Sequence, residues 1–213
     1  MTVIHTKNQR PYDVVKRATD VLVSLIGLVV TSPLQIGIAI LVARRLGRPI
    51  LFRQQRPGRG GQPFQLVKFR TMVQVDSARG LLTDEQRLTP FGAKLRRTSL
   101  DELPTLWNVL RGDMSLVGPR PLMMQYLDRY SPEQRRRHDV RPGITGLAQV
   151  SGRNLLSWEE KFQADVDYVS HRGPLLDSKI ILRTVWLVLQ REGISADGSA
   201  TMPEFFGQAD GRS

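Results

Sequence analysis

Cysteine is absent from the 213 residues, which excludes disulfide bonds, thiolate metal sites and a cysteine nucleophile. The three histidines, His5, His138 and His171, are scattered without the spacing of metal ligands. No G-x-S-x-G elbow and no G-x-x-x-x-G-K-[ST] phosphate loop occurs either. The chemistry that remains is that of carboxylates surrounded by arginines.

Acidic residues are scarce in the first 60 positions, where only Asp13 and Asp20 stand against ten lysines and arginines. The whole chain carries a net charge of +11, so most of its positive excess lies here. A basic protein can bind nucleic acid, anionic lipid or a phosphorylated substrate. These charges flank a strongly apolar segment, which favours a lipid surface. Membrane phospholipids are therefore predicted as partners, and nucleic acid is not.

The apolar segment, Val21–Val42, runs for 22 residues without a charge, enough to cross a hydrocarbon core of about 30 Å. Both flanks are basic, whereas a spanning helix gathers Lys and Arg on its cytoplasmic side. Ser32-Pro33 lies at the midpoint, and proline kinks or breaks a helix because it lacks the amide donor. We predict a re-entrant helix-break-helix hairpin in which the Ser32 hydroxyl helps satisfy a freed carbonyl. A spanning helix kinked at Pro33 is the alternative.

The remaining sequence mixes strand and helix patterns. Strands are predicted at 49–52 and 64–69, around a glycine-rich turn at 56–61. Helices are predicted over 99–110, 156–171 and 176–191. The last of these helices is either part of the core or a second contact with the membrane surface.

The predicted fold class is therefore α+β: a helix-rich monotopic membrane protein with a small cytosolic catalytic domain that contains a β-hairpin. Three parts are expected along the chain. Residues 1–48 form the basic N-terminus and the membrane hairpin, 49–193 the catalytic domain, and 194–213 a polar tail.

Asp101 and Glu102 stand at the predicted start of a helix, one turn after Arg96. A structural reading is available, because Ser99 and Glu102 match the S-x-x-E capping box and acidic residues suit a helix N-terminus. The same position also suits catalysis, since it favours an ionised carboxylate and offers amides to a phosphate. An ionised aspartate is the type of nucleophile that forms aspartyl-phosphate intermediates. Both readings stay open.

Arg120 lies between Pro119 and Pro121, which restrict its backbone. A guanidinium held in this way is pre-organised to bind a phosphate with two hydrogen bonds. A salt bridge within the loop is the structural alternative. Lys68 and Arg153 are further cations without an evident structural role.

Several segments together resemble a known family. The matching stretches are Lys16–Asp20, Ser32-Pro33, Phe52–Gly58, Lys68–Met72, Leu95–Pro104, Asn108–Pro121, Pro142–Arg153 and Asp165–Val169. At this spacing they are similar to the bacterial sugar transferase family, the monotopic phosphoglycosyl transferases. The resemblance covers roughly residues 10 to 207, and the Asp-Glu-Leu-Pro and Gly-Pro-Arg-Pro blocks are its most specific parts.

The resemblance implies an enzyme of the bacterial inner membrane, with its catalytic domain on the cytoplasmic face. It would transfer a sugar-1-phosphate from a UDP-sugar to undecaprenyl phosphate and release UMP. Asp101 corresponds to the family's nucleophile and Glu102 to its acidic partner. The two are the expected ligands of Mg²⁺, and whether Glu102 instead assists proton handling stays open. The positions that match other polar site residues of the family are Lys68, Arg96, Arg120, Arg153 and Asp177. The tail around 201–207 resembles the subgroup that handles diacetamido sugars such as bacillosamine.

Two other functions remain as alternatives. A membrane-tethered nucleic-acid binder would explain the charge, and a non-catalytic scaffold of polysaccharide assembly would keep the hairpin without needing Asp101. The transferred sugar and the oligomeric state are not determined by the sequence, and a homodimer stays open.

Overall fold

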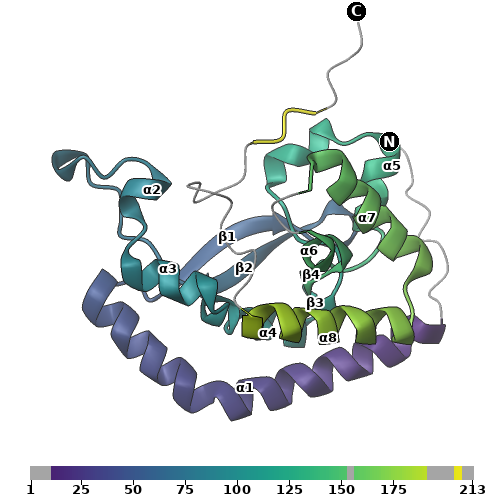
Figure 1. Ribbon diagram of the computed structural model, residues 1–213, viewed down its shortest axis with the longest axis horizontal. Helices are drawn as coiled ribbons and strands as arrows, with labels where there is room; N and C mark the ends of the chain where they lie inside the picture. Colours follow the sequence, from purple (N-terminus) through teal and green to yellow (C-terminus); the bar gives the residue numbers. More distant parts are fainter. Residues whose placement is uncertain (1–10, 153–155, 191–203, 208–213) are drawn as a thin grey trace, which may run out of the picture.

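The computed structural model describes residues 11–152, 156–190 and 204–207, and these form the helix-rich α+β fold that the sequence predicts (Figure 1). The helices are α1 (Pro11–Leu46), α2 (Asp84–Arg87), α3 (Pro90–Arg97), α4 (Thr105–Arg111), α5 (Pro132–Arg135), α6 (Leu147–Ser151), α7 (Trp158–His171) and α8 (Pro174–Gln190). The strands are β1 (Leu51–Pro57), β2 (Pro63–Phe69), β3 (Ser115–Val117) and β4 (Gly143–Thr145). The last two predicted helices correspond to α7 and α8.

The strands form two separate pairs. β1 and β2 make the predicted antiparallel hairpin, in which Leu51 pairs with Phe69. β3 and β4 make a parallel pair, with Ser115 opposite Gly143. The sequence around 142–146 shows only turn signals, because β4 is three residues long and too short for an alternating pattern.

α1 is one continuous helix of 36 residues with Pro33 inside it. The predicted break at Ser32-Pro33 is therefore wrong: the helix bends near its middle, and both ends rise towards the rest of the molecule (Figure 1). The carbonyl of Val29 has no amide partner at Pro33 and instead accepts a hydrogen bond of 2.7 Å from the Ser32 hydroxyl. The expected help from Ser32 is thus confirmed, and it lets the helix continue.

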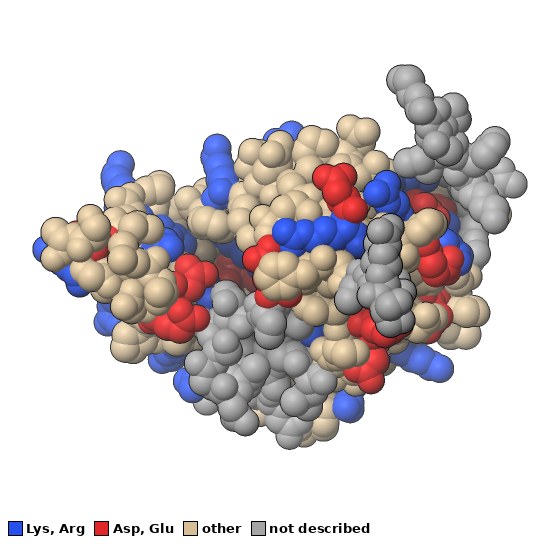
Figure 2. Space-filling view, turned by 90° about the horizontal axis from the view of Figure 1, so that it is seen from above, with Lys and Arg blue, Asp and Glu red and all other residues tan. Residues whose placement is uncertain are grey.

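The middle of α1 is apolar and exposed, with Val29 65 % and Val30 70 % accessible. Only 11 % of its most apolar 18-residue window is buried in the protein, unlike the core helix of a soluble domain. By length and composition α1 is able to cross a membrane. Lys, Arg, Asp and Glu side chains are spread over the face turned away from α1 (Figure 2). The molecule therefore has one apolar side, as a membrane-associated protein requires.

Polar contacts hold the N-terminal half of α1 against the rest of the protein. The Arg17 guanidinium donates to the carbonyls of Val109 and Leu110, at 2.7 and 2.9 Å, and so satisfies the C-terminal end of α4. The buried carboxylate of Asp20 accepts a 3.0 Å hydrogen bond from the Leu116 amide in β3. These contacts fix the approach of α1 to the strands.

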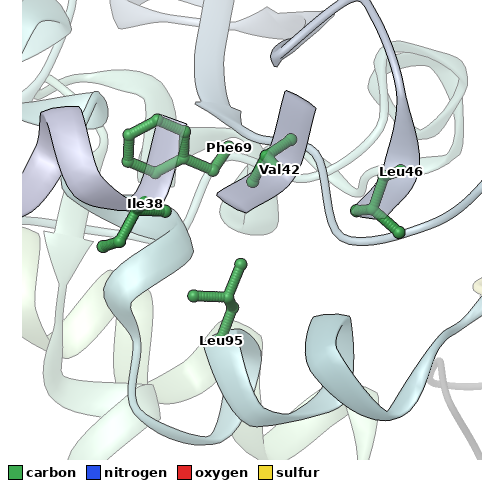
Figure 3. Packing of buried hydrophobic residues seen from close by; sticks show 5 residues of the cluster. All are labelled: Ile38, Val42, Leu46, Phe69 and Leu95. Atoms are coloured by element: carbon green, nitrogen blue, oxygen red, sulfur yellow. The ribbon is translucent and has the colours of Figure 1, made fainter. Parts of the chain in front are cut away.

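Apolar packing holds the other end of α1. Ile38, Val42 and Leu46 are buried against Phe69 of β2 and Leu95 of α3 (Figure 3). Burial of such side chains stabilises the fold by about 1.5–3 kcal/mol each. Both ends of α1 are therefore held against the globular part, while its apolar middle stays exposed.

Candidate active site

The segment that carries Asp101 and Glu102 is a tight turn between two helices. α3 ends at Arg97, and Ser99 has the left-handed backbone angle φ = 54°. Leu100–Glu102 then forms a single turn of 3-10 helix. The predicted capping box is wrong, because the Ser99 side chain makes no cap and the Glu102 carboxylate is bound elsewhere. A non-glycine residue with positive φ is strained, and such residues cluster at functional sites.

Glu102 is held by two cations from different elements. Its Oε1 accepts from Lys68 Nζ of β2 at 2.5 Å and from Arg120 Nη2 of the Gly-Pro-Arg-Pro loop at 3.0 Å. Burial disfavours ionisation of Glu102, but the charges of Arg120 and Lys68 outweigh it and hold the pKa of Glu102 at about 2. Glu102 is therefore a permanent anion that places both cations.

Asp101 has a different environment from its neighbour. The residue is only 8 % exposed, and its carboxylate makes no hydrogen bond or ion pair with any of the described residues. Burial, and then repulsion from Glu102, raises the pKa of Asp101 to about 6, while Lys68, Arg96 and Arg120 act in the opposite direction. Asp101 is thus mostly ionised at neutral pH and has no partner in the described part of the chain. Carboxylates whose pKa values are pushed apart are typical of catalytic sites.

The predicted cations of the site have two kinds of partner: Lys68 and Arg120 bind Glu102, and Arg96 binds Thr71. The Lys68 side chain is 18 % exposed, whereas the Arg120 side chain is 47 % exposed. Arg120 therefore forms the salt bridge of the structural reading and still offers the rest of its guanidinium to solvent. Arg96 is oriented by Thr71, whose hydroxyl accepts from Arg96 Nε at 3.0 Å. Sequence reasoning missed Thr71, although it lies in the matching stretch Lys68–Met72.

Asp177 is not among the residues that the structure brings to Asp101. It lies in α8, is 6 % exposed, and its carboxylate accepts hydrogen bonds from Tyr12, Lys16 and Tyr168 at 2.8, 2.5 and 2.9 Å. These contacts join α8 to the start of α1 and to α7, which is a structural role. Arg153 lies outside the described residues.

Asp101 and Glu102 are also the predicted ligands of Mg²⁺. The Asp101 carboxylate and Glu102 Oε2 accept no hydrogen bond from the described residues, so both can face a cation. No group of three or more His, Asp or Glu side chains that could hold a metal ion exists in the described parts of the chain. Mg²⁺ is commonly bound by one or two carboxylates plus substrate phosphates, and this donor set fits that mode.

The site and the fold together define a class of protein. Two carboxylates of unequal acidity lie among cations suited to phosphate, in a domain fixed to a bent apolar helix. This is a membrane-associated protein built to act on a phosphorylated group.

Comparison with known proteins gives the family. Residues 11–191 match the family model described as bacterial sugar transferase. The chain is 48% identical to the "Uncharacterized sugar transferase EpsL" of Bacillus subtilis, over 92% of this chain and 98% of that protein. It is 43% identical to the "UDP-glucose:undecaprenyl-phosphate glucose-1-phosphate transferase" of Caulobacter vibrioides, over 81% and 69%. The protein therefore belongs to the bacterial sugar transferase family, as its motifs predict.

Other relatives are longer than this chain. The "Undecaprenyl-phosphate galactose phosphotransferase" of Salmonella typhimurium is 39% identical over 84% of this chain but only 41% of its own length. The chain thus spans less than half of some curated relatives and nearly all of the Bacillus protein. The bacillosamine subgroup and the three predicted parts of the chain stay predictions.

Proposed function

We propose that this protein transfers a sugar-1-phosphate from a UDP-sugar to undecaprenyl phosphate, through a phosphosugar intermediate bound covalently to Asp101. The observation that carries the proposal is the contrast between two adjacent carboxylates. Glu102 is neutralised by Lys68 and Arg120, whereas Asp101 is ionised near neutral pH and has no partner among the described residues. A nucleophile needs this combination of charge and availability.

In the first step, a carboxylate oxygen of Asp101 attacks the phosphorus that bears the sugar. The bond from that phosphorus to the bridging oxygen breaks, and UMP leaves with the electron pair. Asp101 then carries the sugar phosphate as a mixed anhydride. Lys68, Arg96 and Arg120 stabilise the negative charge on the transferred group, as cationic clamps do in phosphoryl transfer.

In the second step, a phosphate oxygen of undecaprenyl phosphate attacks the same phosphorus. The bond to Asp101 breaks, the carboxylate is regenerated, and undecaprenyl diphosphate-sugar is the product.

Mg²⁺ held by Asp101, Glu102 and the donor phosphates would neutralise charge on the donor diphosphate before it is cleaved. Neither step requires Asp101 to act as a proton donor.

The membrane arrangement supports this use of a lipid substrate. Both ends of α1 lie on the side of the globular part, as insertion into one leaflet requires (Figure 1). α8 adds exposed apolar side chains, with Leu182 70 % and Leu189 76 % accessible. We place α1 in the inner membrane and the site on the cytoplasmic face, where the headgroup of a lipid phosphate meets the cytosol.

Release of UMP tests the proposal directly. The purified full-length protein in lipid nanodiscs is incubated with undecaprenyl phosphate and each member of a panel of UDP-sugars, including a diacetamido sugar. We expect UMP with at least one donor. A scaffold or a nucleic-acid binder would release none, and the panel also decides the sugar.

A further inference from the structure

Arg56 in β1 is a cation without a counter-ion among the described residues. Its Nη2 donates to Gln54 Oε1 at 2.6 Å, and this is the one hydrogen bond recorded for its guanidinium in the described part of the chain. Its Nε is buried and has no partner there. An unsatisfied donor on a partly buried charge costs stability, so its retention calls for a functional explanation.

The charged group that acts most strongly on Arg56 is another arginine. Burial, and then repulsion from Arg120, lowers the pKa of Arg56 to about 10. Contacts between the two chain segments keep the pair together. Gln54, which binds Arg56, also donates to the sulfur of Met123 at 3.6 Å, three residues beyond Arg120. Pro57 and Arg120 line the same small hollow.

This arrangement leaves an excess of positive charge beside the carboxylates. Lys68, Arg96 and Arg120 act on the two described anions, Asp101 and Glu102, and Arg56 in turn acts with Arg120. Four cations therefore stand against two carboxylates. The excess of two charges matches the two negative charges of the diphosphate in a nucleotide sugar. Paired guanidinium groups are the usual means of binding such oxygens.

The position of Arg56 relative to Asp101 selects one of the two phosphates. In the β-hairpin Lys68 pairs with Phe52, whereas Arg56 lies four residues further along β1 and pairs with Phe64. Lys68 and Arg120 hold Glu102 beside Asp101, and Arg56 lies on the far side of Arg120 from this pair. Asp101 must reach the phosphorus that bears the sugar, so the cation further along lies by the other phosphate.

We propose that Arg56, together with Arg120, binds the nucleoside-side phosphate of the donor, the group that leaves as UMP. This inference rests on the proposed function. Breaking the bond between the two phosphates leaves an extra negative charge on the departing UMP, and the two guanidinium groups stabilise it. Bound phosphate would accept hydrogen bonds from Arg56 Nη1, which donates to none of the described residues.

Calorimetry on the full-length protein tests this, with UMP and uridine as the two ligands. Arg56→Gln should weaken UMP binding by about 10- to 100-fold, the effect of losing a charge-assisted hydrogen bond, and leave uridine binding unchanged. Arg56→Lys should lose less. Arg53→Gln is the matched control, because Arg53 lies exposed in the same strand, and it should change neither affinity. Equal UMP affinity in the wild type and Arg56→Gln, or an equal loss for uridine, would overturn the proposal.

Thermal unfolding separates this role from a structural one. Without ligand, Arg56→Gln should unfold at the same temperature as the wild type or higher, because it removes repulsion from Arg120. Addition of UMP should raise the unfolding temperature of the wild type much more than that of the variant. A lower unfolding temperature of the free variant with an undiminished UMP effect would show a structural residue. Turnover by Arg56→Gln with normal UMP affinity would refute this inference alone, whereas absence of UMP release from the wild type would refute the proposed function.

Discussion

Lys68 Nζ and Glu102 Oε1 lie 2.5 Å apart, and this ion pair leaves the adjacent Asp101 as the available carboxylate of the site. The pair joins β2 to the turn after α3, so the β-hairpin positions the candidate nucleophile. Both side chains are more than four-fifths buried, which strengthens their attraction relative to a surface pair. The following predictions test the roles that this geometry assigns.

Asp101→Asn should reduce turnover by more than about 10³-fold, because the amide oxygen cannot serve as the nucleophile. UMP release with donor and acceptor present is the measurement. Asp128→Asn provides the control, since Asp128 is exposed and outside the site, and it should retain normal turnover. Near-normal activity of Asp101→Asn would show that another group attacks the donor.

The rate of the first step should fall as the pH drops through about 6. The pKa of Asp101 is raised to about 6, and only its ionised form attacks, so the rate should decrease about tenfold per pH unit below that value. The measurement is UMP release without acceptor, which avoids titration of the lipid phosphate. An acid limb of the pH–rate profile centred near the ordinary aspartate pKa of about 4 would contradict the environment described for Asp101.

Glu102→Gln should move this acid limb to lower pH. The Glu102 charge raises the pKa of Asp101, and its removal also frees Lys68 and Arg120 to stabilise the Asp101 carboxylate. The pH profile of UMP release before acceptor addition reports the shift independently of the loss in rate. An unchanged or higher limb would mean that the two carboxylates are not electrostatically coupled.

Asp177→Ala should destabilise the protein by about 3–5 kcal/mol, because it leaves Lys16 without its counter-ion in a largely buried pair. Thermal or denaturant unfolding is the measurement. The acid limb of the remaining activity should stay near pH 6, since Asp177 does not contact Asp101. A variant that keeps its stability but loses activity would place Asp177 in the active site.

The ends of α1 should be accessible from the same side of the membrane. The chain has no cysteine, so His5→Cys and Arg48→Cys each introduce one thiol for labelling in inside-out and right-side-out vesicles. A helix bent near its middle within one leaflet predicts labelling of both positions in inside-out vesicles. Labelling from opposite faces would establish a spanning helix.

Local patterns in the sequence predict much of this fold, because they depend on near neighbours. The periodicity of 156–171, the alternation around the β-hairpin and the function of the Ser32 hydroxyl are of this kind. The continuity of α1 through Pro33 was not predicted, because proline can either kink or break a helix and the sequence pattern does not distinguish the two.

The candidate site divides in the same way. Motif spacing predicts Lys68, Arg96 and Arg120 near Asp101, but it cannot show which carboxylate each cation pairs with. This pairing sets the pKa values of Asp101 and Glu102, and it depends on contacts between residues 18 and 34 positions apart in the sequence. Arg56 was also missed, because an unpaired cation is recognised only when its surroundings are known.

Intact-protein mass spectrometry tests the central claim most directly. The wild-type protein is incubated with its UDP-sugar in the absence of undecaprenyl phosphate, quenched, weighed intact, and then digested to locate the adduct. The account predicts one UMP released per active chain and a mass increase equal to one sugar phosphate less one water, located on the peptide that contains Asp101 and lost when acceptor is added. UMP release that begins only with the acceptor, without any adduct on the protein, would contradict it.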